Sequence, residues 1–373
     1  MYKGIFLKVF SLCCKLTFLL MLAPNLQSGV FSDYFLGLTF SMLATKIILG
    51  GLEEYLPTKV KGSNKISSYF LSSALPTFAL LFISSLFISI YIGNYIPVAI
   101  IVFSFSFYIN GIVRTISPDK YDLMVNLPWL IFLPTVLLYR PTSGSELLII
   151  HLLCHVCVTT VIIKMMPLKL FASNKLGDFN ILLKLIRDSW TKSVSGTIYY
   201  FSFRSPVLIL AVITGGLTDS MSITYSVAEA FWQISMVVIN RRYAHALNKS
   251  LSNPPILIPI IFMLTASVMA LLFDTFNVSV MLGMYIEFVN KIDFESLSVF
   301  IVYLLSLLLF IDLRYRYWGG HRSALKINIY LLIAVSIAWG ISYTTHLFYA
   351  GVLFGAFLIF LLVSNYSFIN TKR

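Results

Sequence analysis

The amino-acid sequence predicts an all-α integral membrane protein with about twelve transmembrane helices. Of its 373 residues, 58% are hydrophobic and 11% are charged, and the mean hydropathy is +0.88. A water-soluble domain carries about 25% charged residues, so this chain lacks the polar surface that water requires. Apolar runs of about twenty residues recur from end to end, and each could cross the roughly 30 Å hydrocarbon core as a helix. Because backbone N–H and C=O groups find no partner in lipid, such runs must be helical.

Twelve apolar runs follow one another along the chain. The first could pass for a signal peptide, but it lacks an A-x-A cleavage site and another run follows at once, so we expect an uncleaved helix. The mixed stretch 275–295 is expected to be an external loop with an interfacial helix. The predicted spans are 4–24, 31–51, 68–92, 95–113, 122–139, 146–166, 194–214, 220–240, 255–274, 296–313, 326–344 and 347–366.

The distribution of basic residues predicts how the chain crosses the membrane. Of the 27 Lys and Arg residues, 22 fall in loops and ends on the side that holds the N-terminus, and two, Arg140 and Lys291, fall on the other side. Lys and Arg accumulate on the cytoplasmic side of membrane proteins. We therefore expect both termini in the cytoplasm and an even number of spans.

The longest connection divides the predicted spans into six plus six. It is dense in basic residues, and its segment Ile181–Lys192 is amphipathic, as expected for a helix on the membrane surface. The predicted parts are an N-terminal six-helix lobe (1–167), a cytoplasmic connection (168–192) and a C-terminal six-helix lobe (193–373). Internally duplicated transporters have such two-halved architectures.

Several function classes are disfavoured by the sequence. The net charge of +12 is explained by the positive-inside bias, so no nucleic-acid partner is expected. Cys154 and Cys157 have CxxC spacing beside His151 and His155, but a second ligand pair is missing, so no metal and no cofactor are expected. P-loop, HExxH and GxSxG motifs are absent and the external loops are short, so we do not expect an enzyme.

Three stretches of the sequence resemble polysaccharide flippases of the O-antigen (Wzx) type. LGGLEEYLPTKVKG (Leu49–Gly62) is similar to the stretch that follows the second helix of these proteins. The region Ile181–Lys249, with SGTIYYFSFRSPVLILAVITGG and ITYSVAEAFWQISMVVINRRYAHALNK, looks like their seventh and eighth helices. Arg314–Tyr343 resembles their basic loop and eleventh helix. One departure is that Ser205 and Pro206 follow Arg204 where many relatives carry an acidic residue, which leaves ion coupling at that position unsupported.

The resemblance implies the fold of the multidrug/oligosaccharidyl-lipid/polysaccharide exporters, with two six-helix lobes around a central cavity. It implies a flippase that moves an undecaprenyl-diphosphate-linked oligosaccharide across the bacterial inner membrane for O-antigen or capsule biosynthesis. The implied partners are the lipid-linked oligosaccharide, membrane lipids, a polysaccharide polymerase and a chain-length regulator. Two alternatives stay open, namely a small-molecule antiporter of the same superfamily and a membrane polysaccharide polymerase or acyltransferase.

Charged residues inside spans are the candidate site residues, because a charge at the bilayer centre costs about 2.5–3.5 kcal/mol on insertion scales. Lys15, Arg204 and Lys46 are expected to bind the anionic substrate in a cationic cavity, and Glu229 is the candidate for ion coupling. Lys46 lies near the cytoplasmic end of its span, where it could also snorkel to the surface. Lys15 and Arg204 occupy corresponding places in the first and seventh spans.

The spacing of Arg204 and Glu229 predicts that they meet. Both residues lie about a dozen positions from the glycines of the turn between spans seven and eight, Gly215 and Gly216. Antiparallel neighbouring helices place such residues at equal depth, roughly 18 Å from the turn. A lone charge there would be costly, so we expect an ion pair or a shared water-filled cavity.

Overall fold

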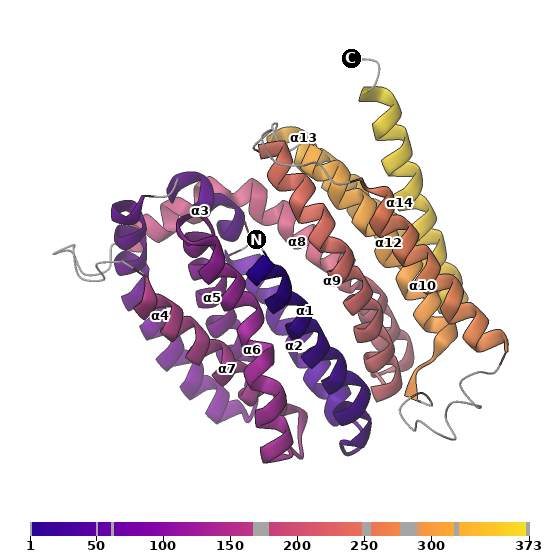
Figure 1. Cartoon of the computed structure of the whole chain (residues 1–373), viewed down its shortest axis with the longest axis horizontal. Helices are drawn as coiled ribbons and strands as arrows, with labels where there is room; N and C mark the ends of the chain where they lie inside the picture. Colours follow the sequence, from indigo (N-terminus) through magenta and orange to yellow (C-terminus); the bar gives the residue numbers. More distant parts are fainter. Residues whose placement is uncertain are drawn as a thin grey trace. The chain divides into compact units, whose positions relative to one another are not determined.

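The computed structural model describes residues 2–49, 51–60, 63–166, 179–247, 255–276, 289, 291–316 and 321–370. The described part is helical and contains no strand (Figure 1). Ten of its helices are long and apolar enough to cross a membrane. The chain is therefore a multi-pass membrane protein, as its hydropathy predicts.

The chain forms two compact units. One unit comprises Met1–Phe18 and Leu26–Thr197, and the other comprises Leu19–Asn25 and Ile198–Arg373. The boundary between the units follows Thr197 and falls inside a helix. It lies a few residues beyond residue 193, where the sequence predicts that the C-terminal lobe begins. Most of the predicted connection before that helix, 167–178, lies outside the described residues.

The first unit contains the helices of the N-terminal half. The first predicted span is composite, because a π-helical turn (Phe18–Leu22) and a short 3₁₀ turn (Ala23–Asn25) follow α1, and all but Phe18 of these turns is grouped with the second unit. The helices are α1 (Tyr2–Thr17), α2 (Val30–Leu49), α3 (Leu52–Val60), α4 (Asn64–Ile92), α5 (Ile96–Ile116), α6 (Pro118–Tyr139) and α7 (Gly144–Met165).

The second unit contains the helices of the C-terminal half, and α8 belongs to both units. Each of the twelve predicted spans overlaps a described helix, whereas the stretch 275–295 lies largely outside the described residues. The helices are α8 (Phe179–Thr214), α9 (Asp219–Leu247), α10 (Leu257–Thr275), α12 (Phe294–Arg316), α13 (His321–Thr345) and α14 (Phe348–Asn370).

Helix ends follow local signals in the sequence. Ser143 caps α7 by accepting a hydrogen bond from the backbone N–H of Glu146 at 3.2 Å, and the Glu146 carboxylate accepts one from the N–H of Thr142 at 2.6 Å. This is close to the capping box of an S-x-x-E sequence, except that the carboxylate reaches the N–H of Thr142 and not that of the N-cap Ser143. Gly93 ends α4 in the left-handed region, at φ 69°, which a residue without Cβ adopts readily.

Each unit is built around one buried helix. In the first unit α5 packs against α2, α3, α4, α6 and α7, and in the second unit α12 packs against α9, α10 and α14. These helices are the fourth and the tenth of the twelve predicted spans, so they correspond in a six-plus-six duplication. The topology of the two units supports an internal repeat that no residue-level similarity reveals.

The packing of α14 on α13 depends on small residues. Gly351 and Gly355 form a G-x-x-x-G pattern, and an ideal Cβ at Gly355 would lie 2.8 Å from the Cβ of Ala338. At Gly351 the added Cβ would lie 2.9 Å from the carbonyl oxygen of Ala338. Small residues let membrane helices approach closely, because lipid provides little hydrophobic drive for their association.

The N-terminal part of α8 belongs to the core of the first unit. Leu182 and Leu185 are buried in a cluster with Leu56, Ile112 and Met124 of the neighbouring helices. These are the apolar residues of the predicted amphipathic segment Ile181–Lys192. In the structure this segment is continuous with the following span, and Leu182 and Leu185 face protein.

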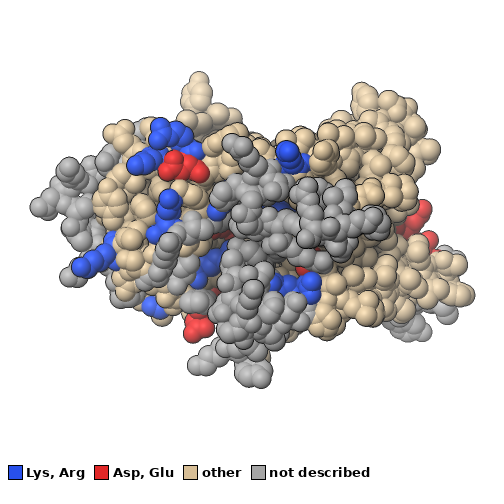
Figure 2. All heavy atoms as spheres, turned by 90° about the horizontal axis from the view of Figure 1, so that it is seen from above, with Lys and Arg blue, Asp and Glu red and all other residues tan. Residues whose placement is uncertain are grey.

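Figure 2 looks onto the end of the molecule near α3 and shows more Lys and Arg than Asp and Glu among the described residues. This surface has the charge expected of a cytoplasmic face. The side of the membrane on which each terminus lies stays a prediction.

Candidate functional site

The turn between α8 and α9 sets two charged residues at the same depth. Gly215 adopts φ 69° directly after α8, a conformation that glycine takes without strain. Arg204 lies ten residues before the end of α8, and Glu229 lies ten residues after the start of α9. Each is therefore about 15 Å from the turn along its helix axis.

Arg204 and Glu229 form a buried ion pair. Arg204 Nη1 lies 3.0 Å from Glu229 Oε2, and the two side chains are 6% and 10% exposed. Gln233 Nε2 donates a hydrogen bond to the other oxygen of Glu229 at 2.8 Å. The Arg204 guanidinium lies 4.9 Å from the ring centroid of Phe203, and its Nε donates to the hydroxyl of Tyr200 at 3.4 Å. The pair is thus enclosed by aromatic and polar side chains of its own two helices.

Pro206 alters the backbone beside this ion pair. Proline has no N–H, so the C=O of Ser202, four residues earlier, loses its helical donor. Tyr303 of α12 supplies a replacement, because its hydroxyl donates to this carbonyl oxygen at 2.8 Å, and the Ser205 hydroxyl donates to the same oxygen at 2.9 Å. The interruption in α8 is therefore closed by a side chain from another helix, two residues from Arg204.

Lys46 is held in a separate ion pair within the first unit. Its Nζ lies 2.7 Å from Glu53 Oε2 on α3 and 4.3 Å from the ring centroid of Phe107. Gly51 makes the approach of α3 possible, because it adopts φ 82° and an ideal Cβ there would lie 2.4 Å from the backbone nitrogen of Ser193. Burial alone would raise the pKa of the Glu53 carboxyl, but Lys46 and Arg114 outweigh it and hold the pKa below its usual value of 4.5.

This depressed pKa predicts a pH-dependent contribution to stability. A carboxyl with a lowered folded-state pKa stabilises the fold above its unfolded-state value and loses that contribution as pH falls through the folded-state value. The Tm of the wild type in detergent should exceed that of Glu53→Gln at pH 7, and the difference should shrink below about pH 4.5. The pair is partly exposed, so its contribution is about 1 kcal/mol or less.

The exposed Glu295, on α12, provides the matched control for this measurement. Glu295→Gln should follow the wild-type Tm at every pH. A Tm deficit of Glu53→Gln that stayed constant down to about pH 3 would show that the charge of Glu53 is not the cause.

Lys15 lies in an aromatic site of the first unit. Its Nζ is 5.5 Å from the ring centroid of Trp129, and the His151 ring is 5.0 Å from the same centroid. His151 Nδ1 shares a 2.7 Å hydrogen bond with the hydroxyl of Tyr34, and its ring is 4.9 Å from that of His155. Within the described part of the chain, His151 Nε2 is buried and has no hydrogen-bond partner.

The four sequence-predicted residues thus fall into three places. Arg204 and Glu229 meet, Lys46 pairs with Glu53, and Lys15 lies beside Trp129. Gln233 was missed, although it lies four residues from the predicted site residue Glu229 and so on the same helix face. The contacts of Tyr303 and of the His151–Tyr34 pair join residues far apart in the sequence, and local spacing carries no signal for them.

The cysteines of the CxxC pair differ in exposure, since Cys154 is buried and Cys157 is exposed. Throughout the described ranges, no group of three or more His, Cys, Asp or Glu side chains is arranged to hold a metal ion. His151 and His155 pack against aromatic rings, with ring centroids 5.1 Å from Phe132 and 5.3 Å from Phe103, respectively.

No protein-family model and no curated protein matches the sequence. Solved transporter structures match the fold over nearly the whole chain. An inward-facing multidrug resistance MATE family transporter of the MOP superfamily matches with a TM-score of 0.60 at 14% identity, over 98% of this chain and 94% of that chain. An outward-facing one matches with a TM-score of 0.56 at 14% identity, over 99% and 96%. A MATE structure in complex with MaL6 gives 0.54 at 15% identity, over 97% and 91%. The chain shares its fold with these transporters.

Proposed function

We propose that the chain is a flippase for an anionic lipid-linked oligosaccharide, an undecaprenyl-diphosphate-linked repeat unit, in the bacterial inner membrane. The observation that carries this proposal is the presence of two buried cations, Lys15 and Arg204, within the predicted spans. Among the described residues, the other buried charged side chains of the predicted spans are the carboxylates Glu229 and Asp312. Buried charge in a membrane is costly and marks functional sites, and buried cations suit an anionic cargo.

The Arg204–Glu229 pair offers a way to couple transport to protons. A diphosphate group competes with the Glu229 carboxylate for the guanidinium, which can bind phosphate oxygens with two parallel hydrogen bonds. Protonation of Glu229 releases Arg204 to the substrate, while Gln233 still contacts the neutral carboxyl. Lys15, in the first unit, is proposed separately as a substrate-binding cation. Lys46 can serve in this way only when Glu53 releases it.

A small-molecule antiporter is the second candidate function. The comparisons favour it, because two of the matching structures are described as multidrug resistance transporters. The buried carboxylates give the antiporter function less support than the comparisons do. Glu229 is paired with Arg204, and Asp312 is paired with Arg242 at 2.7 Å, so a cationic compound would have to displace an arginine from either.

Deletion of the gene distinguishes the two candidates. A flippase mutant should lose its surface polysaccharide while the lipid-linked repeat unit accumulates in the cytoplasmic leaflet, and its susceptibility to toxic cations should not change. An antiporter mutant should keep its polysaccharide and gain susceptibility to such compounds. Loss of the lipid-linked intermediate itself, with its assembly enzymes intact, would point instead to an enzyme.

A further inference from the structure

A pocket of about 240 Å³ lies between α4, α5 and α7 of the first unit. Its walls are almost entirely apolar and include the aromatic rings of Phe78, Phe82 and Phe105. Of the three hydroxyl residues that line it, Ser106 and Thr159 hydrogen-bond to each other, with their oxygens 3.2 Å apart. No charged side chain lines the pocket, so its chemistry fits a hydrocarbon ligand.

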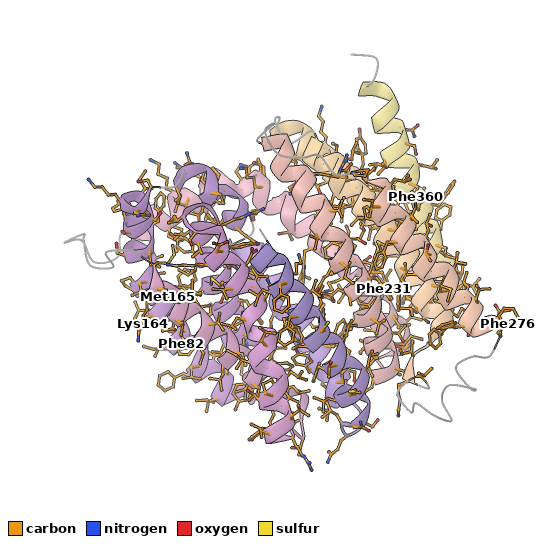
Figure 3. All side chains as sticks on the ribbon, in the orientation of Figure 1. Phe82, Lys164, Met165, Phe231, Phe276 and Phe360 are labelled. Carbon is orange, nitrogen blue, oxygen red and sulfur yellow. The ribbon has the colours of Figure 1, made fainter. Side chains whose placement is uncertain are left out.

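The pocket opens on the lipid-facing side of α4. Phe82, labelled in Figure 3, lines the pocket and is 39% exposed, and its neighbours Leu80 and Phe87 are 68% and 70% exposed. Ala79, which also lines the pocket, is the sixteenth of the 29 residues of α4 and so lies at the middle of the span. In a membrane-spanning chain, exposed apolar residues at this depth face lipid tails.

A pocket of this kind discriminates between hydrocarbon chains by how well they pack and by how much conformational entropy they lose on binding. Lipid tails are as apolar as leucine side chains, so an ordinary acyl chain gains no hydrophobic free energy on leaving the bilayer for the pocket. Such a chain also loses rotational freedom when it is held. An isoprenoid chain carries a fixed double bond in each unit and has fewer rotatable bonds to immobilise. Its methyl branches and double bonds can pack against the rings of Phe78, Phe82 and Phe105.

We propose that this pocket binds the polyisoprenoid tail of the lipid-linked substrate while its polar headgroup crosses the membrane. The inference rests on the proposed flippase function and adds to it a site for the tail. Two of the three helices that wall the pocket, α5 and α7, also carry part of the aromatic site around Lys15, because Phe103 on α5 follows Val102 of the pocket and contacts His155 on α7 at a ring distance of 5.3 Å. The pocket and the aromatic site around Lys15 thus share α5 and α7.

The test uses the full-length protein in vesicles of phosphatidylethanolamine and phosphatidylglycerol, with a diazirine-bearing polyprenyl diphosphate as the probe. Ala79 is exposed and lines the pocket, so Ala79→Phe fills the pocket without disturbing a buried residue. Leu80→Phe, at the adjacent exposed position that does not line the pocket, is the matched control. Photolysis should label residues of α4, α5 or α7 in the wild type and in Leu80→Phe, and labelling should fall about tenfold in Ala79→Phe.

Transport assays separate this inference from the proposed function. Ala79→Phe should slow transport of the long-chain lipid-linked oligosaccharide but leave an analogue with a ten-carbon tail unaffected. Labelling of the pocket by the probe, without transport by the wild type, would support the pocket and refute the flippase function. Wild-type transport that Ala79→Phe leaves intact, or pocket labelling that a photoactivatable phosphatidylglycerol reproduces equally, would overturn the pocket inference and leave the flippase function standing.

Discussion

Replacement of Arg204 by alanine should abolish transport without reducing the amount of protein in the membrane. The substitution removes the guanidinium that the anionic substrate needs, and loss of one partner of a buried charge pair costs about 2–5 kcal/mol of binding. The remaining Glu229 can take up a proton instead of staying charged in an apolar site, and Gln233 continues to contact it. The measurements are headgroup translocation in proteoliposomes and membrane abundance by immunoblot.

Two further variants decide between transport coupling and a static bridge. In the coupled mechanism the Glu229→Gln protein is abundant, but its transport no longer depends on the proton gradient. The charge-swapped Arg204→Glu/Glu229→Arg protein stays inactive, because the arginine that should bind the anionic substrate no longer lies at position 204. A static bridge predicts low abundance for Glu229→Gln and recovery in the swapped protein. Full transport by a normally abundant Arg204→Ala protein would refute a functional role for this pair.

Replacement of Asp312 by alanine should instead destabilise the second unit. Asp312 is 3% exposed, and its Oδ1 lies 2.7 Å from Nε of Arg242 on α9. An arginine cannot be neutralised by losing its proton in a protein, so the variant leaves a permanent charge without its carboxylate. Breaking a buried ion pair in this way costs about 3–5 kcal/mol. The Tm in detergent and the yield of folded protein should both fall.

The two partners of this ion pair differ in their chemistry, so their variants should differ in stability. Arg242→Ala should lower the Tm less than Asp312→Ala does, because Asp312 can become neutral by binding a proton. The apolar double variant Arg242→Met/Asp312→Leu should recover most of the lost Tm, since apolar residues of similar size often replace a buried ion pair without loss. If Asp312→Ala kept the parental Tm, the ion pair would contribute nothing to stability, and it would not serve as a structural counterpart to Arg204–Glu229.

Hydropathy predicted the helices well because the length of a span is set by the bilayer. It missed α3, a nine-residue helix that contains Glu53, Glu54 and Pro57 and has no apolar run. It also separated the segment Ile181–Lys192 from the span that follows, although no Pro or Gly stands between them and the structure has one continuous helix, α8.

The two charged pairs show what sequence spacing can predict about a site. Arg204 and Glu229 were predicted to meet, because a short turn between antiparallel helices fixes their relative depth. The partner of Lys46 was not predicted, because Glu53 reaches it only through the α3 helix that hydropathy missed. Tyr34 and His151 are 117 residues apart, and only the packing of α2 against α7 brings them together.

The proline interruption in α8 has a consequence for the synthesis of the protein. Tyr303, whose hydroxyl closes the gap at the Ser202 carbonyl, lies 101 residues further along the chain. At a translation rate of about 5–20 residues per second, α8 emerges from the ribosome roughly 5–20 s before that tyrosine exists. During this interval the neighbouring Ser205 hydroxyl is the nearby donor that can shield the carbonyl from the lipid. The backbone next to Arg204 thus reaches its final state only when α12 has entered the membrane, so maturation of the ion-pair site is a late step in biogenesis.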